Sequence, residues 1–370
     1  MTTIAHSDED ILICDAGSSS LKLARWSPST ENLESSSHEG SPEQIGEILR
    51  NYLESNPACK TVLHRIVHAG DVAEGPHQLT PALIARISHW QTVAPLHNSL
   101  ALHLIQLTQT HWPHCRSYAL FDSALYSQLP AVSQNYALSD GLSPQWPIKR
   151  YGFHGLAHRA QWTLLNQLKP YRRVITLQLG SGCSATAWLE GKVVDTTMGF
   201  SPLEGLSMAT RCGNIDASIV LHLLEYEEGF TIAKLRRLLT EESGLKGLSG
   251  ISGDMRELLS CTDEKANLAI AHFCYQIQKV IGAYIAVLGG VDAITFGGGI
   301  GENQAVIRND ILTPLKDLSI LLDDKKNAQA DGFTPLHADN SQTEIYLTPV
   351  DEMDEMLGQF LRYRQGEGEE

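Results

Sequence analysis

Hydrophobic positions near the start of the chain form two short runs joined by a small polar loop. Residues 11–14 (ILIC) are apolar throughout, which is typical of a buried strand. Beyond the loop DAGSSS, Leu21 and Leu23 alternate with Lys22 and Ala24, which is the period of a strand with one buried face. The pattern therefore predicts a strand, a Gly/Ser turn and a second strand.

The same pattern returns at 174–188, VITLQLGSGCSATAW, with an apolar strand, a Gly/Ser turn and a second β-compatible run. Two such units predict a duplicated α/β protein with a ligand between the copies. Coincidence is the alternative at this point, because a strand followed by glycine and another strand is a common pattern.

Polar and apolar spacing also predicts several other elements. Residues 27–40 are rich in Ser and Glu and read as a surface loop, and 43–53 read as a helix. A long helix is expected at 267–287 and a short buried strand at 292–296.

The strand at 292–296 runs into GGGIGEN, read as a glycine loop, and then into QAVIRNDIL, a plausible helix. This order offers backbone N–H groups and a helix N-terminus to a phosphate or nucleotide. The chain contains neither G-x-G-x-x-G at this loop nor G-x-x-x-x-G-K-[ST] anywhere. Rossmann dehydrogenases and P-loop kinases are therefore disfavoured.

Length and charge narrow the possible function classes. The 370 residues exceed what one core usually supports, so two domains or lobes are expected. The 28 Lys and Arg against 43 Asp and Glu give a net charge of −15, which repels nucleic acid and anionic membranes. An anionic ligand must then be held by a local cluster of donors.

The seven cysteines form no C-x-x-C pair, which favours reduced thiols. The first residues, MTTIAHSDED, lack the basic flank and apolar core of a targeting signal, and no apolar run reaches the ~18 residues of a membrane span. A cytoplasmic protein is expected.

The opening loop carries candidate chemistry. Ser18 and Ser20 supply hydroxyls, Gly17 lets the backbone approach, Lys22 supplies a positive charge, and Asp15 could face a hydrated cation. This set is compatible with a Mg²⁺–phosphate cradle. The S-x-x-K spelled by the same loop is the nucleophile motif of penicillin-recognising enzymes, but neither S-D-N nor K-T-G follows, so that reading is disfavoured.

A second candidate is HRIVHAGD at 64–71, read as a strand. Arg65 and Val67 then share one face, where a cation beside a small apolar group suits a short carboxylate. A strand with one solvated face is an equal alternative. His64 and His68 have no nearby residues to complete a metal site and read as ordinary core or edge histidines.

Three further positions are weak alone. Asp122 ends an apolar run, where α/β enzymes place catalytic carboxylates, although a strand-end cap is equally compatible. His154 and His158, four residues apart, favour a packed helix start over a site. Arg211 stands beside a cysteine and a glycine.

Taken in order, these segments resemble the acetate kinase family of acetate and propionate kinases, within the actin, hexokinase and chaperone ATPase superfamily. The matching blocks are DAGSSSLK, HRIVHAGD, APLHN, FDSALY, RYGFHGLAH, LQLGSG, DTTMGFSPLEGLSMATRCGNID, SGLKGLSGISGDMREL and DAITFGGGIGEN. The resemblance implies an α/β fold of two duplicated ribonuclease H-like (actin-like ATPase) domains with the active site in the cleft between them. The expected domains are 1–148 and 149–351, with a helix at 352–370 packing back on the first.

The resemblance also implies an activity: reversible transfer of the γ-phosphoryl of ATP to acetate or a similar short acid, with Mg²⁺. The residues implied to act in catalysis are Arg65, Asp122, His154 and Arg211. Those implied to bind the acid are Arg65, Val67, Leu96, Phe153 and Pro202. Those implied near the nucleotide and its phosphates are Ser18, Ser20, Lys22, Gln178, Gly180, Ser181, Gly182, Asp254, Met255, Arg256, Gly299, Ile300, Gly301, Glu302 and Asn303.

The chain departs from the family pattern at three places. Asp15 stands where the family usually has Asn, and QLGSG at 178–182 where it usually has HLGNG. Asp351 stands at the place of a metal-associated glutamate, with Glu352 as the neighbouring candidate, so the implied metal set is Asp15, Asp351 and Glu352. These departures leave open a divergent acyl kinase with another acid or donor. The alternative from another functional class is a nucleotide-binding sensor without turnover. The resemblance also suggests a homodimer.

Overall fold

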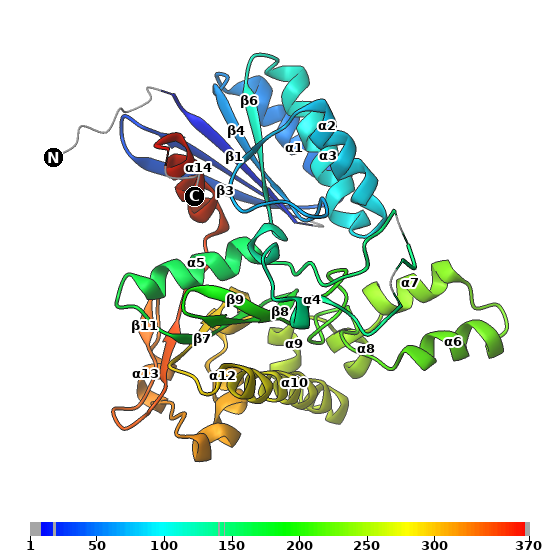
Figure 1. Cartoon of the computed structure of the whole chain (residues 1–370), viewed down its shortest axis with the longest axis vertical. Helices are drawn as coiled ribbons and strands as arrows, with labels where there is room; N and C mark the ends of the chain where they lie inside the picture. Colours follow the sequence, from blue (N-terminus) through cyan, green and yellow to red (C-terminus); the bar gives the residue numbers. More distant parts are fainter. Residues whose placement is uncertain (1–8, 18–19, 140, 144, 367–370) are drawn as a thin grey trace. The chain divides into compact units, whose positions relative to one another are not determined.

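A computed structural model describes residues 9–17, 20–139, 141–143 and 145–366 (Figure 1). By contacts the chain forms two compact units. Unit 1 comprises Met1–Ser127, His154–Leu156 and Asp351–Glu370, and unit 2 comprises Gln128–Phe153 and Ala157–Val350. The contacts thus place residues 128–148 in unit 2, earlier than the boundary expected from the sequence, whereas the C-terminal segment groups with unit 1.

Unit 1 is built on a mixed sheet of six strands in the order β3-β2-β1-β4-β6-β5. The predicted hairpin is confirmed, because β1 and β2 pair antiparallel with Asp15 opposite Lys22. Strands β4 and β6 run parallel to β1, so their carboxyl ends meet at one edge of the sheet. The strands are β1 (Ile11–Ala16), β2 (Ser20–Ser27), β3 (Asn32–Glu39), β4 (Thr61–Ile66), β5 (His77–Gln78) and β6 (Arg116–Phe121).

The prediction of a loop over 27–40 is wrong, because β3 occupies most of it and pairs with β2 along its whole length. The strand lies at the edge of the sheet, and most of its side chains, including those of Ser35 to Ser37, are exposed. Backbone hydrogen bonds to β2 hold it, so nothing in its side chains distinguishes it from a loop. A polar edge strand also discourages pairing with other chains.

Helices cover both faces of this sheet (Figure 1). Leu12 and Cys14 of β1 pack against a core that includes residues of α1 and α3, while Ile11 and Ile13 pack against residues of α14. The predicted helix over 43–53 is confirmed as α1, which begins with a capping box at Ser41. The helices of this unit are α1 (Pro42–Ser55), α2 (Pro81–His89), η1 (Trp90–Thr92), α3 (Pro95–His111), η2 (Ala124–Tyr126) and α14 (Glu352–Arg364).

Unit 2 repeats the strand order around a second six-stranded sheet, β11-β12-β10-β7-β8-β9. β7, β8 and β9 form an antiparallel meander like β1, β2 and β3, while β10 and β12 continue parallel to β7 as β4 and β6 continue from β1. The predicted duplication is therefore confirmed. The strands are β7 (Arg173–Leu179), β8 (Cys183–Leu189), β9 (Lys192–Thr196), β10 (Ala293–Gly297), β11 (Thr334–Pro335) and β12 (Glu344–Leu347).

The predicted long helix and short strand are confirmed as α10 and β10. Most of the remaining helices belong to unit 2, although the first two residues of α5 group with unit 1. Their bounds are α4 (Ala131–Gln134), α5 (Gly155–Asn166), α6 (Ala217–Tyr226), α7 (Ile232–Glu241), α8 (Gly244–Ser249), α9 (Met255–Leu259), α10 (Glu264–Leu288), α11 (Gly298–Asn303), α12 (Ala305–Leu312), η3 (Thr313–Leu318) and α13 (Asp324–Ala328).

The sequence predicted a loop for the glycine segment after β10. The structure instead has the short helix α11 there. Gly298 begins it at φ +77°, and a Cβ there would lie 2.7 Å from the carbonyl oxygen of Leu179. The carboxylate of Glu302 accepts the Gly298 N–H at 2.9 Å, and Ile300 is buried. These contacts override the low helix propensity of glycine.

None of the helices within the described ranges has the length and hydropathy needed to cross a bilayer.

Candidate active site

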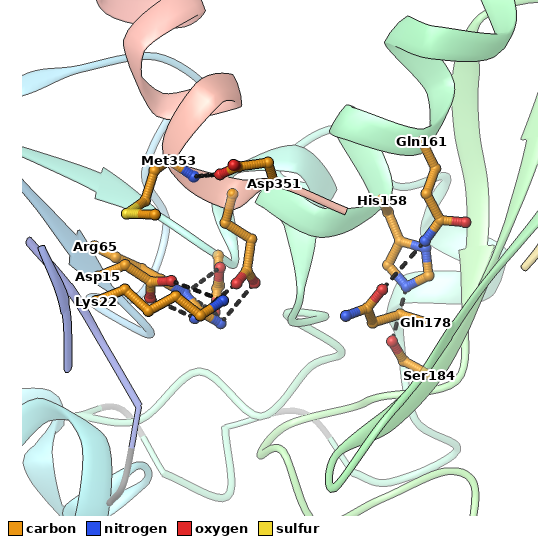
Figure 2. Close-up of polar contacts among 11 residues, drawn as sticks. Asp15, Lys22, Arg65, His158, Gln161, Gln178, Ser184, Asp351 and Met353 are labelled. Carbon is orange, nitrogen blue, oxygen red and sulfur yellow. Dashed lines mark hydrogen bonds and ion pairs between the residues drawn. The ribbon is translucent and has the colours of Figure 1, made fainter. Parts of the chain in front are cut away.

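A cluster of charged side chains lies where β1, β4 and β6 of unit 1 end (Figure 2). Arg65 Nη1 contacts Asp15 Oδ1 at 2.8 Å, and Nη2 contacts Asp122 Oδ2 at 2.9 Å. Glu352, the first residue of α14, contacts Nη2 at 3.1 Å. The parallel strands bring the first two carboxylates together, and α14 adds the third.

The cluster holds more acidic groups than cations. Three carboxylates, all nearly buried, face Arg65, and Lys22 Nζ, on a side chain that is 42% exposed, lies 3.8 Å from Asp15. Burial raises the pKa of Asp15, but the charges of Arg65 and Lys22 and hydrogen bonds from Arg65 and Glu352 outweigh it, so that pKa is lowered. Burial raises the pKa of Asp122 despite the opposing charge of Arg65.

Glu352 is more readily protonated than an ordinary glutamate. Burial, together with the charges of Asp15 and Asp122, raises its pKa to about 7 against the opposing charge of Arg65. A carboxyl whose pKa is raised in the folded state favours folding below its unfolded pKa, and this contribution is lost as pH rises through the folded value.

We therefore expect the wild-type protein to lose stability between about pH 5 and pH 8 relative to Glu352→Gln, with a slope of up to about 1.4 kcal/mol per pH unit. Thermal unfolding of both proteins across this range measures the difference. Glu344→Gln is the control, because the pKa of Glu344 is lowered to about 2 and the group does not titrate in this window. A constant difference between wild type and Glu352→Gln would contradict the assignment.

The predicted metal set is not brought together. Asp351 Oδ1 accepts the backbone N–H groups of Met353 at 2.9 Å and Asp354 at 3.2 Å, so this carboxylate caps the start of α14 (Figure 2). Glu352, one residue later, is the group that joins Asp15 in the Arg65 cluster. Asp351 is kept from the cluster by this capping role, because an aspartate that precedes a helix accepts hydrogen bonds from the first N–H groups of that helix.

Asp15 and Glu352 nevertheless suit Mg²⁺ by their chemistry. In the residues that the structure describes, no group of three or more His, Cys, Asp or Glu side chains has the arrangement of a metal site. Mg²⁺ in nucleotide sites is commonly held by one or two carboxylates, with water and phosphate oxygens completing its shell. Two hard oxygen ligands in a cluster with surplus negative charge meet that requirement.

His154 lies in a strained turn beside the end of β6. Its φ is +61°, a left-handed conformation that costs free energy in residues other than glycine. The next N–H, of Gly155, donates to the carbonyl oxygen of Asp122 at 2.9 Å, and a Cβ on Gly155 would lie only 2.2 Å from that oxygen. Only glycine permits this approach, which fixes the backbone of His154 relative to Asp122.

The segment after β4 is clamped by a residue to which the sequence analysis gave no role. Asn98 Oδ1 accepts the His68 N–H at 3.3 Å, and Asn98 Nδ2 donates to the His68 carbonyl oxygen at 2.7 Å. Asn98 is fully buried in α3, inside the APLHN block. A buried asparagine needs hydrogen-bond partners for its amide, but only the fold shows that it is buried. Val67, next to His68, is buried as well.

Other predicted residues of unit 1 take different places. Burial lowers the pKa values of His64 and His68 to about 3, as for neutral core side chains. Ser20 Oγ lies against Gly17, where a Cβ would meet it at 2.6 Å. Ser18 and the side chain of Leu96 lie outside the described residues.

Unit 2 contains a pocket of about 770 Å³ lined by the turn between β7 and β8 and by the starts of α9 and α11. Gly180 and Ser181 come from the turn between β7 and β8, and Gly299 comes from the start of α11. Asp254 caps α9 by accepting the Arg256 N–H at 2.8 Å. The lining residues are Gly180, Ser181, Ala209, Thr210, Gly253, Asp254, Met255, Arg256, Gly299, Ile300, Asn303 and Gln304.

Four residues of unit 2 that were predicted near the nucleotide do not line this pocket: Gly182, Gln178, Gly301 and Glu302. Glu302 is used structurally, because its Oε1 accepts the N–H groups of Gly298 at 2.9 Å and Val350 at 3.2 Å. Gly301 is buried inside α11.

Arg211 differs from Arg65 in its surroundings. Its Nη1 donates to the Pro202 carbonyl oxygen at 2.7 Å, and no carboxylate within the described ranges pairs with it. Burial lowers the pKa of Arg211, with only weak opposition from Cys183. A partly buried guanidinium without an acidic partner retains a desolvation cost, and this favours binding of an anion.

His158, by contrast, is structural. One ring nitrogen lies 2.7 Å from Ser184 Oγ (Figure 2) and the other 2.7 Å from Thr176 Oγ1. Burial lowers the pKa of His158 to about 3. This agrees with the preference for a packed helix start.

Comparisons with known proteins converge on one family. The profile described as "Acetokinase family" matches residues 27–358. Acetate kinase of Clavibacter sepedonicus is 39% identical over 320 residues, covering 84% of this chain and 79% of that protein. The crystal structure of Porphyromonas gingivalis acetate kinase matches with a TM-score of 0.82 at 29% identity, covering 95% of this chain and 99% of that one. A propionate kinase from Francisella tularensis matches with a TM-score of 0.84 at 30% identity, covering 95% and 98%.

Proposed function

This chain belongs to the acetate kinase family and is a phosphotransferase with a carboxyl group as acceptor, and we propose that it moves the γ-phosphoryl of ATP reversibly to acetate or a similar short acid with Mg²⁺. In this reaction a carboxylate oxygen bonds to the γ-phosphorus while the bond from that phosphorus to the β,γ-bridging oxygen breaks. The products are an acyl phosphate and ADP, and no proton needs to be removed because the acid is already ionised near neutral pH.

The observation that carries the proposal is that Arg211, partly buried, has no acidic partner among the described residues. Phosphoryl transfer needs cations that offset charge on the equatorial oxygens of the phosphoryl group in flight. An arginine already neutralised by a carboxylate does this poorly, whereas Arg211 has donors to spare. The pocket of about 770 Å³ in the same unit, lined by glycines and Asp254, has the size range of a nucleotide site.

The groups of unit 1 take the roles that their contacts allow. Asp122 is bonded to Arg65 through both carboxylate oxygens, so it orients that guanidinium and is not needed as a base. Arg65 binds the acid or phosphoryl group, and His154 supplies a further donor from its fixed turn. Asp15 and Glu352 would hold Mg²⁺, which when bound offsets the negative charge of the nucleotide phosphates.

Val67 provides a test of acid specificity. If its side chain meets the methyl group of acetate, Val67→Ala enlarges the site and shifts kcat/KM toward propionate by roughly 1 to 3 kcal/mol per methylene accommodated. Kinetics with both acids measure the ratio, and Val72→Ala, at another buried valine of the same unit, is the control. An unchanged acetate-to-propionate ratio in Val67→Ala would show that Val67 is only part of the core.

The phosphoryl donor tests the proposal itself. Small residues such as Gly180, Gly253 and Gly299 are part of the pocket lining and leave room for a base, so we expect ATP to be used and pyrophosphate to be used poorly or not at all. Acyl phosphate formed from acetate is measured with each donor at equal concentration. Robust turnover with pyrophosphate and none with ATP would point instead to a divergent acyl kinase. Because ATP is a cytoplasmic substrate, the cytoplasm stays the predicted location.

A homodimer is also proposed, through α6 of unit 2. None of the residues of α6 is buried, and Ile219, Leu221 and Tyr226 are 48%, 59% and 72% exposed. A second copy that covers these exposed apolar side chains would remove them from water. Leu221→Asp should therefore shift the protein from dimer to monomer in light scattering. The control Leu168→Asp, at a residue that is 52% exposed elsewhere in unit 2, should not. A wild-type monomer would overturn the proposal.

A further inference from the structure

A buried glutamine connects the end of β7 to two threonines of unit 2. Gln161, on α5, has no solvent-exposed surface. Its Oε1 accepts the Thr295 hydroxyl at 2.7 Å and lies 3.2 Å from the Thr348 hydroxyl. Its Nε2 donates to Gln178 Oε1 at 3.3 Å, as Figure 2 shows. Gln178 lies near the end of β7, two residues before Gly180 of the pocket.

The hydrogen-bond pattern determines which way both amides face. In the structure Gln161 Oε1 accepts the Thr295 hydroxyl, so the carbonyl of Gln161 faces β10. Its NH₂ group then faces Gln178 and requires the Gln178 carbonyl as acceptor. The NH₂ group of Gln178 is directed away from Gln161 (Figure 2) and has no partner in the described ranges.

We propose that Gln161 is a positioning residue that holds Gln178 with its amide N–H groups available to a nucleotide phosphate. This inference rests on the proposed function, in which Gln178 lies near the phosphates. A glutamine offers an anion either a donor or an acceptor, and the acceptor orientation repels it. Where the family usually has a histidine, Gln178 therefore needs a neighbour that selects the donor orientation.

The first glycine of GGGIGEN fits the same arrangement. A Cβ on Gly297 would lie 2.9 Å from both Cδ and Nε2 of Gln161 and 2.6 Å from Val350 Cγ2. These distances leave no room for a larger residue beside the Gln161 amide. Gly297 thus serves the packing of Gln161, whereas Gly299 lines the pocket.

Variants at Gln161 and Gln178 test the proposal. Gln161→Met removes both hydrogen-bonding groups, and Gln161→Glu keeps the acceptor for Thr295 while losing the donor to Gln178. We expect each to lower kcat by about tenfold, the effect of one lost hydrogen bond, with little change in the KM for the acid. In a Gln178→Leu background, Gln161→Met should have no further effect, because the group that it positions is gone.

Thr295→Val keeps the shape of the core and removes only the hydroxyl that orients Gln161, so it should lower kcat in the same direction even if the Gln161 variants fold poorly. The matched control is Thr343→Val, which removes another buried hydroxyl of unit 2, bonded to the Val291 carbonyl oxygen at 3.2 Å. It should leave kcat unchanged. The proposal would be overturned if Thr295→Val and Thr343→Val lowered kcat equally. It would also be overturned if the losses of kcat in Gln161→Met and Gln178→Leu added up in the double variant.

The wild type, Gln161→Met, Gln178→Leu and the double variant are also compared for ATP affinity by calorimetry. This readout separates the two hypotheses. If the wild type makes no acyl phosphate, the proposed function fails, but coupling between residues 161 and 178 in ATP affinity would still support the positioning role. Additive effects on both turnover and ATP affinity would refute it.

Discussion

Replacing Arg211 by alanine should lower kcat by roughly 10³-fold or more, while ATP affinity changes little. The reason is that Arg211 is a partly buried cation to which no carboxylate of the described residues is paired, so it is available to the charge that develops during phosphoryl transfer. The loss of such an arginine removes stabilisation of the transition state rather than of the bound nucleotide. Turnover by coupled assay and ATP affinity by calorimetry measure the two quantities separately.

Arg237→Ala is the matched control for Arg211→Ala. Arg237 belongs to the same unit, but its side chain is 69% exposed and pairs with Glu242 on the surface. Both kcat and ATP affinity should stay at the wild-type level in this variant. If Arg211→Ala loses ATP affinity in step with turnover, Arg211 belongs to the ground-state nucleotide site and the proposed role is wrong.

Replacing Arg65 by methionine should abolish measurable turnover and destabilise the protein by about 3 to 5 kcal/mol, the cost of leaving buried charges unpaired. Three carboxylates converge on this one guanidinium. Without it their pKa values rise, and the folded state must either bury their charges or bind protons. The loss of stability should therefore be larger at pH 8 than at pH 5, as measured by thermal unfolding.

The double variant Arg65→Met/Asp15→Asn separates the two effects of Arg65. Removing one of the three negative charges should restore part of the stability, because fewer unpaired carboxylates stay buried. Turnover should not return, since the cation that we propose to bind the acid or the phosphoryl group is still missing. Recovery of activity together with stability would show that Arg65 has only a structural role.

The parts of the fold that the sequence predicted correctly are those with a strong local pattern. The hairpin β1–β2 and its repeat β7–β8 follow from apolar runs interrupted by glycine and serine, and α10 follows from its helical period. The edge strand β3 and the helix α11 were missed because contacts elsewhere in the fold hold them. For β3 these are backbone bonds to β2, and for α11 they are the Glu302 carboxylate and the packing against Leu179.

The candidate site shows the same division. Arg65 and Asp122 end neighbouring parallel strands, so their meeting could be inferred from the order of the strands. It could not be inferred that Glu352, rather than Asp351, joins the Arg65 cluster, because this depends on which carboxylate caps α14. Gln161 could not be found either, since its role depends on the side-chain contact with Gln178 across α5 and β7.

The measurement that tests the central claim most directly is acyl phosphate formation, trapped as the hydroxamate, by the wild-type protein with ATP and Mg²⁺ across straight-chain acids from acetate to butyrate. We predict hydroxamate formation with acetate or propionate, in parallel with ADP release. The claim would be contradicted if the protein bound ATP in calorimetry yet formed no acyl phosphate from any of these acids, which is the behaviour of a nucleotide-binding sensor.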